Sequence, residues 1–318
     1  MKLIFMGTPD FAVPSLERLL ADGHTVSLVV TQPDKPVGRK QILTPPAVKV
    51  CAEAHGLTVY QPSSMRTQEA YDRLAQENAD AIIVVAYGKI LPKPILDLTP
   101  GGCINVHGSL LPRYRGAAPV QWAVINGDAE AGVTTMLLDE GVDTGAMLLT
   151  HSRPLDDTIT GGELFDVLAA DGADLLSRTL HALQDGTLTP TPQPEEGACY
   201  ASMLNKSMCP LDWTKSARML HNQVRGMNPW PVATCCLDSK VTKVFVTRVG
   251  AATDAASGTC VSVISASFPQ PVTIPVTIIP TMNIPTSLLF IVSSPLVYHI
   301  SFNIFLSSHL ILHSMSHC

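Results

Sequence analysis

Asn105 and His107 are the residues of this sequence best suited to acid–base chemistry. They are two positions apart at the end of a predicted strand, residues 103–106, and residues i and i+2 of a strand face the same side. A neutral imidazole can take a proton from an attacking amine near pH 7, and an amide can donate to a developing oxyanion. We therefore expect both side chains to point into one cleft.

Asp143 is the carboxylate that would complete this set. It lies in the loop 139–145, where Gly141 and Gly145 would let the chain bend close to the imidazole. A carboxylate there would orient the imidazole and stabilise its charged form. An Asn-x-His pair alone is often only the polar end of a strand, but the polar, proline-rich segment 105–119 and this second glycine-rich loop favour a functional interpretation.

The elements before this segment alternate between strand and helix. The run 81–86 is continuous and β-branched, which suits a strand covered on both faces, and the alternation predicts a parallel sheet with right-handed crossovers. The predicted strands are residues 2–6, 25–31, 57–60 and 81–86, and the predicted helices are residues 46–55 and 67–78, with a further helical spacing from Phe11 to Leu20.

The order changes after a helix predicted at 117–125. Two strands, 133–138 and 146–150, follow with only the loop 139–145 between them. In open α/β sheets ligands bind beyond the carboxyl ends of the strands, and both polar loops lie at such ends.

A dinucleotide-binding dehydrogenase is an alternative, because the first turn contains glycine and Asp34 follows the second strand. However, Gly7-Thr8-Pro9 lacks the G-x-G-x-x-G spacing that lets a backbone approach a pyrophosphate, and no Walker A motif is present. The sequence argues against a nucleotide cofactor.

Composition indicates one large and one smaller domain in a reducing compartment. The chain has 318 residues, 46% of them hydrophobic, and eight cysteines without a C-x-x-C pair. The N-terminus lacks a basic region followed by an apolar run. We therefore expect a cytoplasmic protein.

Charge is uneven along the chain. Residues 1–205 contain 14 Lys and Arg against 24 Asp and Glu, a net charge of -10, whereas residues 206–254 contain 7 against 3, a net charge of +4. Such asymmetry can mark a module that binds a polyanion, although a window this short can also drift by a few charges. The count alone leaves both interpretations open.

The last 64 residues, 255–318, contain no charged side chain of these four types. The stretch 286–312 is long enough for a membrane span, but Pro295, Asn303 and several serines interrupt it and no Lys or Arg flanks it. An out-of-frame or otherwise aberrant terminus explains the composition better, and it predicts poor order.

The segment Asn105–Pro119, with Val84–Gly88 upstream and Asp139–Gly145 downstream, resembles the folate-dependent formyltransferases. The motifs at 7–12, 31–34 and 225–231 narrow the resemblance to the branch that acts on methionyl-tRNA. It covers about residues 1–254.

The resemblance implies an α/β, Rossmann-like formyltransferase domain with a parallel-rich sheet, and a smaller OB-like β-barrel domain that looks incomplete. The implied domains are catalytic residues 1–188, a linker at 189–205, a partial tRNA-binding domain at 206–254 and the tail 255–318.

The same resemblance implies transfer of the formyl group of 10-formyltetrahydrofolate to the amino group of methionyl-initiator tRNA, without a metal. We also expect a monomer. Asn105, His107 and Asp143 match the catalytic trio. The residues expected to bind folate are Ser109, Leu110, Leu111, Pro112, Tyr87 and Gly88. Formylation of a small amine, such as a sugar nucleotide or glycinamide ribonucleotide, and an inactive folate-binding protein are the alternatives.

Basic residues in two regions are the expected tRNA contacts, although for any one of the loop charges an ordinary solvated side chain is an equal alternative. Arg113 and Arg115 are expected to shape the folate-binding loop or to contact the 3' end of the tRNA, and one of them could instead brace the loop around Asp139. Trp213 and Trp230 are expected in the core. The candidate tRNA contacts are Lys35, Arg39, Lys40, Lys206, Lys215, Arg218 and Arg225.

Overall fold

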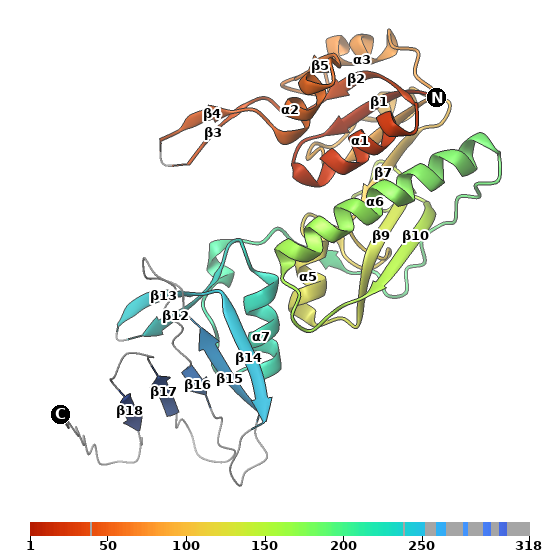
Figure 1. Cartoon of the computed structure of the whole chain (residues 1–318). Helices are drawn as coiled ribbons and strands as arrows, with labels where there is room; N and C mark the ends of the chain where they lie inside the picture. The colour runs from red at the N-terminus through yellow and green to blue at the C-terminus, as the bar shows by residue number, and fades with distance from the viewer. Residues whose placement is uncertain are drawn as a thin grey trace. The chain divides into compact units, whose positions relative to one another are not determined.

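The computed structural model (Figure 1) describes residues 1–38, 40–237 and 239–251, and the backbone of four later strands. The described chain divides into two compact units. The first unit comprises residues 1–123, 128–156 and 162–203, and the second comprises residues 124–127, 157–161 and those from 204 onward.

A seven-stranded sheet forms the centre of the first unit, in the order β10-β9-β7-β6-β1-β2-β5. The five strands from β7 to β5 are parallel, whereas β9 is antiparallel to both of its neighbours, β7 and β10. The predicted parallel-rich sheet and the change of order after the loop 105–119 are therefore confirmed. The strands are β1 Lys2–Gly7, β2 Thr25–Val30, β5 Val59–Tyr60, β6 Ala81–Val85, β7 Cys103–His107, β9 Glu130–Leu137 and β10 Met147–Pro154.

Helices cover both faces of this sheet, which explains why β6 and β7 are buried along their whole length. On one face, Ile4, Met6 and Ile82 pack in a cluster with Leu74 of α3 and Ile95 of α4. The helices are α1 Val13–Ala21, α2 Ala47–Ala54, α3 Gln68–Ala75, α4 Lys93–Leu96, α5 Pro119–Asn126 and α6 Gly161–Gln184.

Helix α6 is the longest element and was not predicted from the sequence. Thr179 of α6 lies 2.8 Å from the hydroxyl of Thr135 in β9, and Arg18 of α1 donates to Ser177 of α6 at 3.0 Å. These contacts place α1 and α6 side by side against the sheet, as Figure 1 also shows.

The segment after α6 belongs to the first unit as far as Met203, beyond the predicted domain end at residue 188. Thr191 and Met147 exchange two backbone hydrogen bonds of 2.8 Å. Farther along, β11 (Tyr200–Ala201) pairs in parallel with β8 (Arg115–Gly116). Most of the predicted linker is thus tied to the loops at the edge of the sheet.

The second unit contains a helix and antiparallel strands. Helix α7 (Ala217–Gly226) begins at Ser216, whose hydroxyl accepts from Met219 N. Its Leu220 and Val224 pack with Ala233 and Val244 in a small core. The other elements are η2 Lys206–Met208, the hairpin β12 Ala233–Leu237 and β13 Lys240–Val244, and the sheet of β14 Val246–Ala251, β15 Thr259–Ile264, β16 Val276–Ile278, β17 Leu289–Ser293 and β18 His299–Asn303.

Most of residues 255–318 lie outside the described residues, so their predicted poor order stays a prediction. Across the part of the chain that was described, no helix combines the length and apolarity that a bilayer crossing requires.

Candidate active site

A cavity of about 580 Å³ opens beyond the carboxyl ends of β6 and β7 in the first unit. The strand order of the sheet reverses between β1 and β6, and Phe11, which follows β1, also lines the cavity. Open α/β sheets bind ligands at such points. Asn105, His107 and Asp143 all line the cavity. The structure therefore brings together the three residues that the sequence selected.

His107 is 6% exposed and is held by a backbone carbonyl. Its Nε2 lies 2.8 Å from the carbonyl oxygen of Tyr114. A carbonyl oxygen only accepts, so Nε2 must carry a proton and donate it. In the neutral imidazole Nδ1 is then the unprotonated nitrogen, and it faces Asp143.

Asp143 is positioned beside this nitrogen by its own backbone conformation. Its Oδ2 lies 3.7 Å from His107 Nδ1 and accepts a 2.8 Å hydrogen bond from the Gly116 N–H. The φ of Asp143 is +53°, in the left-handed region. A Cβ at Gly145 would overlap the carbonyl oxygen of Leu137, so the tight bend predicted here does depend on glycine.

The Asn105 side chain is 8% exposed. Among the residues that the structure describes, none makes a hydrogen bond to its amide. Because Asn105 also lines the cavity, its two N–H groups are available to a ligand there.

Residues 86–90, after β6, form another wall of the cavity. The carbonyl of Tyr87 accepts from the Thr8 hydroxyl at 3.0 Å and from Gln32 Nε2 at 2.8 Å. Gly88 has a φ of +77°, and a Cβ there would lie 2.5 Å from Gln32 Nε2. Residues from the motifs at 7–12 and 31–34 therefore hold in place the wall that contains Tyr87 and Gly88, two of the residues expected to bind folate.

The Tyr87 side chain itself points into the core. It is 1% exposed, and burial raises the pKa of its hydroxyl to about 12. Tyr87 is therefore suited to a structural role, because its hydroxyl stays protonated at neutral pH.

The segment 109–112 follows β7 and is tied to β9. Thr134 donates to Ser109 O at 2.7 Å and accepts from Leu111 N at 3.2 Å. Ser109 and Leu110 line a second cavity of about 130 Å³, and Leu111 and Pro112 line neither cavity. Of the six predicted folate contacts, only those at 87 and 88 therefore line the larger cavity.

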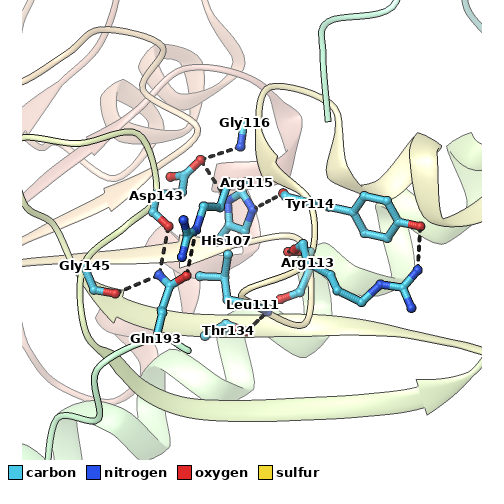
Figure 2. A network of polar contacts seen from close by, with 11 residues as sticks. His107, Leu111, Arg113, Tyr114, Arg115, Gly116, Thr134, Asp143, Gly145 and Gln193 are labelled. Carbon is cyan, nitrogen blue, oxygen red and sulfur yellow. Dashed lines mark hydrogen bonds and ion pairs between the residues drawn. The ribbon is translucent and has the colours of Figure 1, made fainter. Parts of the chain in front are cut away.

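Figure 2 shows a network around Asp143 that includes a residue the sequence did not single out. Gln193 donates from Nε2 to the carbonyls of Asp143 and Gly145, both at 2.8 Å. Its Oε1 accepts from Arg115 Nε at 3.0 Å. Arg115 therefore braces the loop 139–145, one of the roles predicted for it.

Arg113 belongs to a different part of this network. Its Nη2 donates to Asp128 at 2.9 Å and to the Tyr114 hydroxyl at 3.0 Å, and that hydroxyl donates to Asp128 at 2.8 Å. These contacts hold the residue whose carbonyl binds His107.

Two of the three predicted tRNA contacts of the first unit lie in the hairpin of β3 (Lys35–Val37) and β4 (Ile42–Thr44). Lys35 and Lys40 are exposed, whereas Arg39 lies outside the described residues.

In the second unit, Lys206 and Lys215 are exposed, and the exposed Arg218 pairs with Asp157 at 2.8 Å. Arg225 is only 4% exposed and donates to Asn222 at 3.0 Å. This buried position argues against the phosphate contact predicted for Arg225.

The two tryptophans differ from one another. Trp213 packs against the core of the second unit, as expected. Trp230 is 56% exposed, so the prediction that it is buried is wrong. Trp230 lies in the turn between α7 and β12, and connecting segments of this kind run over the surface of a domain.

Clusters of three or more His, Cys, Asp or Glu side chains that could hold a metal ion are absent from the residues that the structure describes.

Comparison with known families agrees with this geometry. The formyl transferase family matches residues 1–180, and the formyl transferase C-terminal domain matches residues 203–268. The chain belongs to the formyltransferase family. The second match extends past residue 254, where the resemblance recognised from motifs ended.

The curated relatives include two bacterial methionyl-tRNA formyltransferases. The protein from Acetivibrio thermocellus is 50% identical over 249 residues, and that from Agathobacter rectalis is 52% identical over 249 residues. Each alignment covers 78% of this chain and 80% of the relative.

A solved structure with the same fold is an N-formyltransferase from Helicobacter canadensis, in complex with folinic acid and dTDP-3-aminofucose. The two chains are 20% identical, with a TM-score of 0.62 and coverage of 83% of this chain and 96% of the other. At this identity the likeness concerns the fold alone.

Proposed function

We propose that this enzyme transfers the formyl group of 10-formyltetrahydrofolate to the amino group of methionyl-initiator tRNA, as a cytoplasmic monomer. The observation that supports this most strongly is the convergence of Asn105, His107 and Asp143 on one cavity. It occurs in a chain about half identical to methionyl-tRNA formyltransferases over 249 residues.

The three side chains have separate roles in this reaction. As the amine nitrogen attacks the formyl carbon, it becomes positively charged and gives a proton to Nδ1 of His107. The carbonyl oxygen becomes an oxyanion, to which the Asn105 amide donates. Asp143, 3.7 Å from Nδ1, stabilises the imidazolium by its negative charge.

Collapse of the tetrahedral intermediate completes the exchange. The bond from the formyl carbon to N10 of the donor breaks, and N10 takes up a proton, so the amine has lost one hydrogen and the folate has gained one. Because Nε2 of His107 is bonded to Tyr114 O, we assign Nδ1 as the nitrogen that both accepts and returns the proton.

The cavity is suited to part of a folate. Its volume of about 580 Å³ falls within the range of small-molecule sites, roughly 300–1,000 Å³. Thr8 and Gln32 hold the backbone of the wall 86–90 by hydrogen bonds to the Tyr87 carbonyl, which favours a wall that is already in place when the donor binds. Tyr87 and Gly88 remain our candidates for donor contacts, with Ser109 and Leu110 in the adjoining cavity.

The tRNA would be attracted by exposed lysines in both units. Lys35 and Lys40 lie on the β3–β4 hairpin, and Lys206 and Lys215 lie in the second unit. Phosphate contacts of this kind weaken as salt rises.

A transfer assay with several acceptors tests the proposal. The purified full chain is incubated with 10-formyltetrahydrofolate and methionyl-initiator tRNA, methionyl-elongator tRNA or an amino-sugar nucleotide. We expect transfer mainly to the initiator tRNA. Transfer to the sugar alone would indicate a small-amine formyltransferase, and folate binding without transfer to any acceptor would indicate an inactive folate-binding protein; either result contradicts the proposal.

A further inference from the structure

The side chain of Gln193 uses both ends of its amide at the active site. Nε2 donates to the carbonyls of Asp143 and Gly145, at 2.8 Å each, and Oε1 accepts from Arg115 at 3.0 Å. Gln193 lies 50 residues from Asp143 along the chain, so these bonds join segments that are distant in sequence, next to the backbone pair of Thr191 and Met147. Figure 2 shows the amide between the two carbonyls and the guanidinium.

The loop that Gln193 binds is under strain. Asp143 has a φ of +53°, a conformation that costs energy for a residue with a side chain and persists only where surrounding contacts enforce it. Four of its neighbours, residues 139–142, are exposed, and the loop has solvent on that side. The two hydrogen bonds from Gln193 therefore hold the backbone on both sides of position 144.

Arg115 makes this attachment rigid. It is 5% exposed, and within the described residues it forms no ion pair with a carboxylate. Its Nε donates to Gln193, and its own N–H donates to the carbonyl of Cys199 at 2.9 Å. The neighbouring Gly116 N–H donates to Asp143 Oδ2 at 2.8 Å. Residues 115 and 116 are adjacent in the chain, and they bind Gln193 and the Asp143 carboxylate respectively.

We propose that Gln193 is a positioning residue for formyl transfer: by fixing the backbone of the loop 139–145, it keeps the Asp143 carboxylate beside Nδ1 of His107. The inference rests on the proposed function. Gln193 does not line the cavity, so it acts through Asp143 and not on a substrate.

A double-mutant cycle tests this assignment. Gln193→Leu removes all three hydrogen bonds at similar size, and Gln193→Glu keeps an acceptor for Arg115 but cannot donate to the two carbonyls. We expect each to lower kcat roughly 10- to 100-fold, since small displacements of catalytic groups have effects of that order. The KM values for donor and tRNA should stay within about twofold of wild type. In an Asp143→Asn background the further loss should be less than about twofold, because the group being positioned is already gone.

Gln223→Leu is the matched control. Gln223 also donates from Nε2 to two backbone carbonyls, those of Met208 at 2.9 Å and Pro210 at 3.4 Å, but in the second unit. We expect its kcat to equal that of wild type. A Gln193 variant with unchanged kcat, or with the same fold loss in both backgrounds, would overturn the proposal.

Hydrogen exchange gives a second readout that needs no substrate. The Gly116 amide donates to Asp143, so its exchange should be at least about tenfold faster in both Gln193 variants and unchanged in Gln223→Leu. Unchanged exchange in the variants would contradict the positioning role even if wild type is active. If wild type transfers no formyl group, the proposed function fails, while exchange at Gly116 still decides what Gln193 does.

Discussion

The two units of this protein hold their proposed functional side chains in opposite ways. In the first unit His107 is 6% exposed and fixed by a 2.8 Å hydrogen bond, whereas Lys206 and Lys215 in the second unit are exposed to solvent. Proton transfer depends on the placement of one nitrogen, but attraction of a polyanion depends on how many charges are present. Substitutions of Asn105 or His107 should therefore lower kcat, and those of the exposed lysines in the second unit should raise KM for tRNA.

His107→Ala should have the largest effect. Loss of the general base should lower kcat by about 10²- to 10⁴-fold, because proton transfer by a positioned side chain contributes that much. The KM for tRNA should change little. Rapid-quench assays at saturating tRNA measure the change, and His55→Ala, at an exposed residue after α2, is the control. More than a tenth of wild-type kcat in His107→Ala would contradict the role.

Asn105→Ala should come next. Removal of one donor to an oxyanion costs about 10²- to 10³-fold in kcat, and no other side chain among the described residues depends on this amide. The thermal midpoint should therefore stay close to that of wild type. A lower midpoint with unchanged kcat would instead assign Asn105 to the fold.

The double variant Lys206→Ala/Lys215→Ala should change tRNA binding and leave kcat unaltered. We expect KM for tRNA to rise severalfold, and the slope of log KM against log salt to fall by up to about 2, since each lysine that binds a phosphate adds about 1 to that slope. Lys93→Ala, which removes an exposed charge paired with Asp97 in the first unit, is the control. An equal shift in the control would mean that only net charge matters.

Asp34→Asn should have the smallest effect, on stability and not on kcat. Hydrogen bonds from Gln61 and Lys49 lower the pKa of Asp34. A group whose pKa is lowered by folding stabilises the native state above its unfolded pKa, about 3.9, and this contribution is lost as pH falls through the folded value. The difference between the urea midpoints of wild type and variant should therefore be largest at pH 7 and should shrink as pH falls below about 4. A difference that stays constant between pH 7 and strongly acidic pH would contradict this origin.

The sequence predicts the central sheet well because its strands are continuous apolar runs. The prediction of strands at 25–31 and 81–86 matches β2 and β6 to within a residue. Helix α6 is not among the predicted elements, although Leu164, Leu168 and Leu175 recur at the spacing of an amphipathic helix.

The site shows where local patterns stop being informative. Asn105 and His107 are two residues apart on one strand, so their common direction follows from strand geometry. Gln193 lies in a proline- and threonine-rich stretch that resembles a linker, and its partners at Asp143 and Gly145 are 50 and 48 residues away. Because nothing near Gln193 in the sequence marks it, only the folded arrangement reveals its contacts.

The chain from Thr191 to Ala201 also defines where this protein can be divided. It supplies Gln193 to one loop of the site and β11 to the other, although it follows the last helix of the first unit. A chimera joined directly after α6 would discard part of its own active site, whereas a junction after Met203 would retain it. Under the proposed function, the second unit can therefore be exchanged without loss of the Gln193 and β11 contacts only beyond that residue.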